Sequence, residues 1–232
     1  MRFLIPSLLA LLLPMVSMAQ NCLGVAFRPG MAYEMSTYNA KDKLTGKVAY
    51  RIESVKQEGG STLVDVSTQS EDEKGKKQPA YTIRYTCTGN ELVADLSGMA
   101  QSMQNAGMKD MDMRLKTNRL VYPATLSTGL KLPDGQLEAD MLNNGSTMMT
   151  MNMTMTNRVV GEKESITTPA GTFNAFKISS DMNLENRAMG IPIRATMRTV
   201  SYRTNDQLLD IRTETYNKNG KLMGYTLLSK VN

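Results

Sequence analysis

Short runs in which apolar and polar residues alternate constrain this chain more than any other feature. Over residues 149–156 four methionines alternate with threonine and asparagine, and over 191–198 apolar residues alternate mostly with arginine and threonine. A period of two places successive side chains on opposite faces of a strand, so each run predicts a strand buried on one face. Turn residues separate such runs every 10–15 residues or so, which favours antiparallel β structure over βαβ units.

We therefore predict an all-β, mainly antiparallel fold: a curved sheet, an open barrel or a sandwich of about 10–12 strands. One segment breaks the pattern. The apolar spacing in residues 97–114 predicts a short helix that ends or is interrupted at Gly107. Residues 122–135 contain Pro and Gly and are expected to form a crossover between two sheets, in preference to a weak domain boundary.

The N-terminus has the features of a secretory signal peptide. Arg2 precedes an apolar run over residues 3–16, and Ser17-Met18-Ala19 supplies a small-x-small cleavage pattern. The run is too short to span a membrane, and no later stretch is apolar enough. We expect cleavage after Ala19, which leaves one exported, soluble domain over residues 20–232 in the periplasm or outside the cell.

Two cysteines, Cys22 and Cys87, are expected to form one disulfide, because thiols of exported chains are usually oxidised. Cys87 shares strand parity with Ile83 and Tyr85, so its sulfur should point inward. A free redox or metal-binding pair is the alternative, but the CxxC spacing is absent. Lipid attachment to Cys22 requires small residues before it, and Gln20-Asn21 stand there instead.

Composition removes several classes of function. The chain has no histidine, which excludes Ser-His and Cys-His catalysis and histidine zinc sites. Its net charge of +5 is interspersed, without a basic stripe interleaved with aromatic residues, so nucleic-acid binding has little support. A carboxylate-only hydrolase stays open through Asp134, Glu138 and Asp140, if two of them face one substrate. We expect a protein without enzymatic activity or cofactor.

Methionine is unusually frequent: the chain has twenty, of which three lie in the predicted signal peptide. Three interpretations compete: adaptable core filling, a deformable apolar cavity for a lipid, and Cu(I) binding by thioethers. Alternate residues of one strand lie nearly 7 Å apart, so one row does not converge on a metal without a partner strand. The expected lining of an apolar cavity is Met149, Met151, Met153, Met155, Ile193 and Met197.

The segment 167–178, TTPAGTFNAFKI, predicts a hairpin. Pro169 presets the backbone for the second position of a turn, and Gly171 supplies a residue that tolerates positive φ. Other landmarks are Phe27-Arg28-Pro29-Gly30, Gly46, Asn219-Gly220-Lys221 and Gly224-Tyr225.

In order and content these landmarks resemble the domain-of-unknown-function 3108 family, also labelled TapB-like, of exported proteins in Gram-negative bacteria. The resemblance implies a curved, mostly antiparallel β structure in the periplasm, without an established activity. Such a shape is similar to that of lipoprotein-localisation carriers, which hold acyl chains in a half-open barrel. Two functional hypotheses follow: binding of an apolar ligand such as a lipid or acyl chain, and a structural or protein-interaction module for another envelope protein.

The disulfide can be tested directly. We expect peptide mapping of the exported protein without reductant to recover Cys22 and Cys87 in one cross-linked fragment. The bridge closes a loop of roughly sixty residues, so its reduction should lower the free energy of unfolding by about 2–4 kcal/mol. Two separate thiol peptides from protein never exposed to reductant would contradict the assignment.

Overall fold

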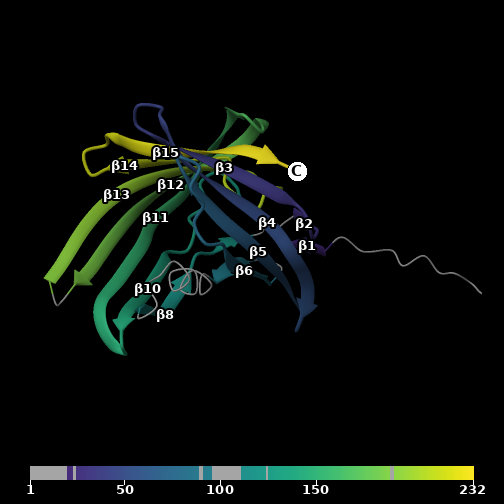
Figure 1. Ribbon diagram of the computed structural model, residues 1–232. Coiled ribbons are helices and arrows are strands. Elements are labelled where there is room, and N and C mark those ends of the chain that lie inside the picture. The colour runs from purple at the N-terminus through teal and green to yellow at the C-terminus, as the bar shows by residue number, and fades with distance from the viewer. Residues whose placement is uncertain (1–19, 23–24, 89–90, 96–110, 124, 189–190) are drawn as a thin grey trace, which may run out of the picture.

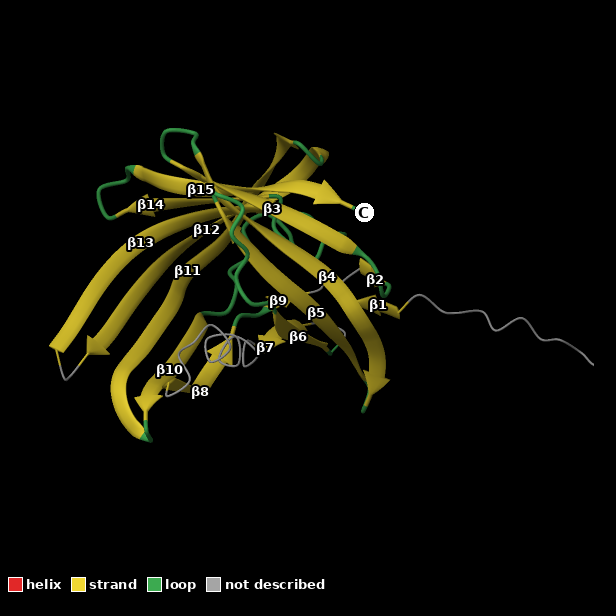
Figure 2. Ribbon diagram, in the orientation of Figure 1, coloured by secondary structure: helices red, strands yellow, loops and turns green. Residues whose placement is uncertain are grey.

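The computed structural model describes residues 20–22, 25–88, 91–95, 111–123, 125–188 and 191–232. The predicted signal peptide, residues 1–19, lies outside this part. Within it, every regular element is a strand (Figure 2), which confirms the all-β prediction. No helix of sufficient length and apolarity to cross a membrane occurs among these residues.

Fifteen strands are present in the described part, more than the predicted 10–12. In chain order they are β1 (Gln20–Cys22), β2 (Val25–Phe27), β3 (Ala32–Asn39), β4 (Leu44–Glu58), β5 (Ser61–Asp72), β6 (Tyr81–Cys87), β7 (Glu91–Asp95), β8 (Met111–Arg119), β9 (Tyr122–Pro123), β10 (Gly135–Asn143), β11 (Ser146–Thr168), β12 (Gly171–Ala188), β13 (Ile191–Arg203), β14 (Arg212–Asn217) and β15 (Leu222–Val231).

Thirteen of these strands form one continuous antiparallel sheet in the order β8-β10-β11-β12-β13-β14-β15-β3-β4-β5-β6-β7-β9, and β1 pairs only with β2. The C-terminal β15 lies beside β3, so the two halves of the chain join in the middle of the sheet. The sheet curls strongly (Figure 1), and its long strands lie around a concave interior.

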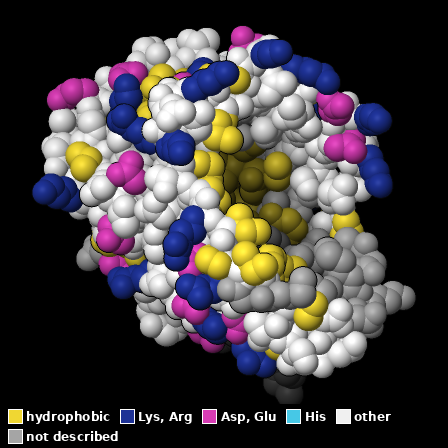
Figure 3. Space-filling view, turned by 90° about the vertical axis from the view of Figure 1, so that its left-hand side faces the viewer, with side chains coloured by type: hydrophobic (Ala, Val, Ile, Leu, Met, Phe, Trp, Pro, Cys, Tyr) yellow, Lys and Arg dark blue, Asp and Glu magenta, His cyan; other side chains and the backbone are white. Residues whose placement is uncertain are grey.

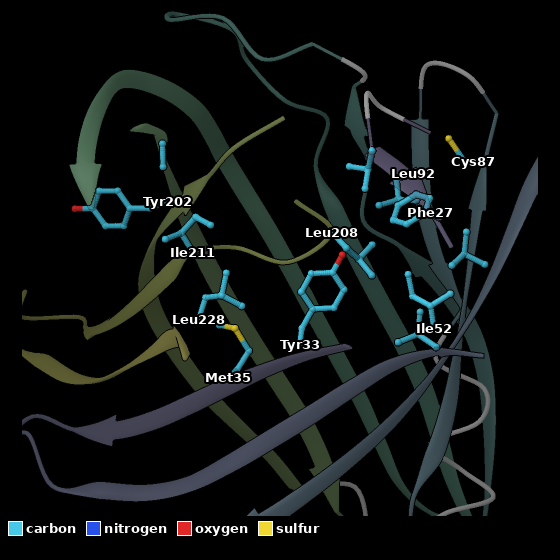
Figure 4. Packing of buried hydrophobic residues seen from close by; sticks show 14 of the residues in the cluster. Phe27, Tyr33, Met35, Ile52, Cys87, Leu92, Tyr202, Leu208, Ile211 and Leu228 are labelled. Carbon is cyan, nitrogen blue, oxygen red and sulfur yellow. The ribbon is translucent and has the colours of Figure 1, made fainter. Parts of the chain in front are cut away.

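Alternation of burial explains why the strands curl around one core. In β5 the side chains of Thr62, Val64, Val66 and Thr68 are buried, whereas the intervening ones are partly exposed. Bulges add curvature: β11 gains one residue on β12 between Thr156 and Val159, and such insertions bend a strand and increase its twist. The larger core cluster joins both halves of the sheet, and Figure 4 shows Ile52, Leu208 and Leu228 among its members.

The two ends of the sheet approach each other without forming a ladder. β7, near one end, faces β8 at the other end, and Asn118 Nδ2 of β8 donates a hydrogen bond to the Ala94 carbonyl of β7. The chain after β8 crosses to the opposite end, where β9 pairs with β7, and then returns as β10 beside β8. The predicted crossover between two sheets was therefore wrong: this segment joins the two ends of one sheet.

The predicted helix over residues 97–114 falls mostly outside the described residues. Its last part does not: Met111 to Arg114 begin β8, which pairs with β10. Residues 112–117 also alternate in exposure, as expected for a strand with one sheltered face. The helix therefore does not extend to Arg114.

Pro169 and Ala170 form the turn between β11 and β12, and Thr168 pairs with Gly171. The Thr168 hydroxyl accepts a hydrogen bond from the Ala170 amide at 3.2 Å, which helps to fix the turn. Gly171 has φ of 137°, a value that L-residues with a side chain rarely adopt.

Replacing Gly171 by alanine should therefore destabilise the protein by about 1–3 kcal/mol through backbone strain. Urea unfolding followed by circular dichroism measures the change. Thr172→Ala, at the next exposed strand position, is the control and should cost less. Equal stabilities of Gly171→Ala and the wild type would contradict the role of positive φ.

Candidate functional site

A cavity of about 270 Å³ lies where the two ends of the sheet approach each other. Tyr85 of β6 and Ala94 of β7 line it from one end, and Leu137 of β10 and Met155 of β11 line it from the other. Most of the lining is apolar. Figure 3 shows a hollow on one face of the molecule, with hydrophobic side chains along its walls. The incomplete closure of the sheet thus creates a site that can take an apolar ligand.

Two of the predicted lining residues, Met153 and Met155, line this cavity. They pair with Leu137 and Gly135 of β10, which line it as well. At Gly135 an added Cβ would lie 2.8 Å from the Leu120 side chain, so a larger residue would crowd the cavity wall.

The other four predicted residues do not line the cavity, and this part of the prediction needs correction. Met149 and Met151 pair with Met141 and Ala139, farther along β10 than the cavity extends. Met197 lies on β13, which contributes only Arg203 to the lining, and Ile193 is 61% exposed near the free end of the β12–β13 hairpin. Strand parity predicted a face, but the cavity occupies only one part of that face.

A cluster of charged and aromatic side chains lies at one side of the cavity. The buried Arg203 guanidinium contacts the Asp210 carboxylate at 2.8 Å and donates a second hydrogen bond to the Leu208 carbonyl at 3.1 Å. It also lies over the Tyr122 ring, 4.4 Å from the ring centre. Arg203, Asp210 and Tyr122 all line the cavity, so an apolar chamber has a polar group of fixed geometry at its edge.

A second arginine reaches the same aromatic ring from β11. Arg158 is only 2% exposed, and its guanidinium carbon lies 4.8 Å from the centre of the Tyr122 ring. Its Nη1 donates to the carbonyls of Val121 at 3.0 Å and Pro133 at 2.6 Å, which ties the crossing segment to the sheet. Its Nε and Nη2 are buried without a hydrogen-bond partner among the described residues.

Burial decides the charge states here. It raises the pKa of Tyr122, and it raises the pKa of Tyr85 to about 12, so both rings are neutral near pH 7. Burial alone would lower the pKa of Arg203, but the Asp210 carboxylate, together with Tyr122 and Tyr85, offsets this, and the net shift of the pKa is upward. Arg203 is therefore charged over the whole physiological range.

None of the three candidate carboxylates lines the cavity. Glu138 and Asp140 both accept hydrogen bonds from Lys116 Nζ, at 3.2 and 2.9 Å, and Asp140 also accepts a hydrogen bond from the Thr150 hydroxyl. The hydrogen bond from Lys116 holds the pKa of Asp140 below its ordinary value, which is the wrong direction for a general acid. Asp134 is exposed in the loop before β10.

Cys87 is buried at the end of β6, close to Phe27 and Leu92 in Figure 4. The side chain of Cys22 lies outside the described residues, so the Cys22–Cys87 disulfide stays a prediction. In the described part of the chain, no three His, Cys, Asp or Glu residues come together as a metal site.

The sequence profile of the DUF3108-like family matches residues 28–228, most of the chain. The chain belongs to the DUF3108-like family. The match covers the turn and strand landmarks from Arg28 to Tyr225, so it confirms the DUF3108 family that they indicate. A search of curated proteins finds no match to this DUF3108-like protein.

Two crystal structures share the fold. A candidate lipoprotein from Parabacteroides distasonis superimposes with a TM-score of 0.69 at 21% identity, over 92% of this chain and 100% of its own. A candidate exported protein from Bacteroides fragilis, described as having a YmcC-like fold, superimposes with a TM-score of 0.65 at 20% identity, over 88% of this chain and 96% of its own. At these identities the likeness shows the fold alone.

Sequence reasoning missed the charged cluster of this DUF3108-like protein. Arg158 follows the alternating methionines at an even position, where parity predicts an outward side chain. The bulge between Thr156 and Val159 shifts the register by one residue and turns Arg158 and Val160 inward. The sequence also did not predict the role of Asp210, because the loop between β13 and β14 is what brings its carboxylate into contact with Arg203.

The Arg203–Asp210 pair should be a sensitive point for stability. Asp210→Asn removes the counter-charge and leaves a buried guanidinium, at an expected cost of about 3 kcal/mol in the free energy of unfolding. Asp206→Asn, on the exposed part of the same loop, is the matched control and should change stability little. Chemical unfolding of both variants at pH 7 gives the difference, and equal stabilities would show that the pair contributes little.

Proposed function

We propose that this DUF3108-like protein is an exported, non-catalytic envelope protein that binds an apolar ligand, a lipid or an acyl chain, in the cavity between the ends of its sheet. The observation that carries the proposal is the cavity itself, which is mostly apolar and lies where the strands could otherwise have closed. The predicted signal peptide supports an envelope location, and so do the two structural neighbours, one a candidate lipoprotein and one a candidate exported protein.

The size of the cavity limits the ligand. Its volume of about 270 Å³ is slightly below the range of roughly 300–1,000 Å³ that is usual for small-molecule sites. One short chain fits such a space better than the several chains of a complete phospholipid. Methionine suits this role, because Met153 and Met155 are flexible and polarizable and can adapt to chains of different length.

A second candidate function, a protein-interaction module, is favoured by one observation. Ile191 and Ile193 are 67% and 61% exposed, and both lie on one face of β13 at the end where β12 and β13 meet. Large apolar side chains that are grouped on a surface often mark a protein contact. A carrier function requires the cavity, whereas an interaction module requires this exposed strand end.

A substitution that fills the cavity distinguishes the carrier function from the interaction module. Ala94→Phe places a ring in the cavity and should weaken binding of the neutral fluorescent probe N-phenyl-1-naphthylamine by roughly tenfold or more, because the site loses its free volume. Ala195→Phe, at an exposed position of β13, is the matched control and should leave binding unchanged. Thermal melting by circular dichroism verifies that both variants fold.

Native mass spectrometry of the protein recovered after export provides a second measurement. We expect a population carrying one co-purified acyl compound, which Ala94→Phe should lack and Ala195→Phe should retain. A wild-type protein that carries no lipid and does not bind the probe would overturn the carrier function and leave the interaction module as the better explanation.

A further inference from the structure

We propose that this DUF3108-like protein has a site for a monovalent soft metal ion, Cu(I) or Ag(I), formed by the thioethers of Met113, Met141 and Met149. The site is separate from the apolar cavity, because none of the three residues lines it. Three observations carry the proposal: these methionines do not fill the core, they lie side by side in register, and their described neighbours on the same face are uncharged.

Most methionines of this chain are not core residues. Of those whose side chains the structure describes, only Met35 is buried. The two core clusters consist mainly of valine, isoleucine, leucine and aromatic residues. Met113, Met141 and Met149 are half-buried, so solvent can reach these side chains. Neither core filling nor the cavity therefore explains why methionine occupies these three positions.

Strand register brings the three methionines together. Met141 of β10 lies directly opposite Met113 of β8 on one side and directly opposite Met149 of β11 on the other. Residues that lie opposite each other in an antiparallel pair point to the same face, with Cβ atoms about 4.5–5.5 Å apart. A single strand cannot bring its methionines together in this way, but here two partner strands each supply one. Three adjacent strands thus present one cross-strand row of thioethers.

The row lies on the concave face of the curled sheet. Leu137 and Met153 form a pair that lines the cavity, and Met141 and Met149 follow at even spacing on the same two strands. Because the sheet curls toward this face (Figure 1), side chains on it converge. Methionine is unbranched and has three rotatable bonds, so the outer thioethers can turn toward the sulfur of Met141. A site with three sulfur ligands therefore needs side-chain rotation and no movement of the backbone.

The chemistry of this row selects the kind of ion. Thioether sulfur is a neutral, polarizable ligand, and soft ligands of this kind favour Cu(I) over hard cations such as Mg²⁺ and Ca²⁺. The described neighbours on the same face are Leu115, Ala139 and Met151, none of which is charged. A site without a counter-charge makes the desolvation of an ion costly, and more so for a divalent ion than for a monovalent one. The row therefore suits a monovalent soft ion.

Titration with Ag(I), a redox-inert ion of this class, tests the site. The exported protein is first treated with iodoacetamide, so that no free thiol can bind the ion, and is then analysed by native mass spectrometry. We expect one tightly bound Ag(I) per protein and no retained Zn(II) under the same conditions. In anaerobic competition, the protein should also withdraw Cu(I) from the chelator bicinchoninate, with the same stoichiometry.

Substitutions assign the ion to the row. Met141→Leu removes the central thioether but nearly conserves volume, so stability should change little. The Ag(I) affinity should fall at least about tenfold, because even the loss of an outer-shell partner has an effect of that size in metal sites. Met223→Leu is the matched control, since Met223 is 51% exposed on β15 and lies outside the row. It should leave Ag(I) binding unchanged.

Met149→Leu, at the end of the row, should also weaken Ag(I) binding, and it gives the result if melting curves show that Met141→Leu does not fold. A wild-type protein that retains no Ag(I) would overturn the metal site. Equal Ag(I) affinities of the wild type, Met141→Leu and Met149→Leu would do the same, because the ion would then bind other sulfur atoms.

The metal site and the carrier function can fail separately. Because the row does not line the cavity, N-phenyl-1-naphthylamine should bind equally well with and without Ag(I). Displacement of this probe by Ag(I) would place the ion in the cavity and overturn its assignment to the row. A protein that retains Ag(I) but binds no probe and carries no lipid would support the metal site and overturn the carrier function.

Discussion

The two ends of the sheet approach each other without backbone pairing between β7 and β8 in the described residues. This gap determines where the cavity and the buried polar groups of the protein lie. Thirteen strands pair in one continuous order, but the last step, from β7 to β8, is bridged within the described residues by the Asn118 side chain rather than by backbone pairing. Unpaired strand edges expose hydrogen-bonding groups and invite association with other chains. Here β9 covers one part of the edge, and the crossing segment that follows β8 packs beneath the curled sheet, where Arg158 holds its carbonyls.

The same gap explains why polar groups are buried beside an apolar cavity. A segment that crosses the interior carries backbone carbonyls that need donors. Arg158 supplies two of these hydrogen bonds, and the Tyr122 ring shields its guanidinium from one side. Arg203 fixes the loop between β13 and β14 through Asp210 and the Leu208 carbonyl. Structural necessity thus places positive charge next to the cavity.

The methionines of this protein lie in two kinds of environment. Met153 and Met155 line the cavity, whereas Met35 belongs to the larger core cluster, which joins both halves of the sheet. Ile52 and Val64 of the N-terminal half are fully buried in that cluster. The cavity borders this core, because Leu92 and Leu208 belong to the cluster and also line the cavity.

The amino-acid sequence by itself determined the class of fold, the family and the position of the β11–β12 hairpin. Strand alternation and turn residues such as Pro169 and Gly171 are local, and their physical effect does not depend on the rest of the chain. The absence of histidine excludes Ser-His and Cys-His catalysis and histidine zinc sites, whatever the fold.

Tertiary structure alone decided which residues meet. One bulge after Thr156 changed the parity of β11 and turned Arg158 inward. Asn157, a residue type that tolerates positive φ, takes φ of 52° in this bulge, but its type alone does not predict an inserted residue. The cavity lining combines β6, β7, β8, β10 and β11 with a loop far along the chain. Long-range pairing sets these distances, so the selection of Met153 and Met155 over Met149 and Met151 depends on where a curled sheet fails to close.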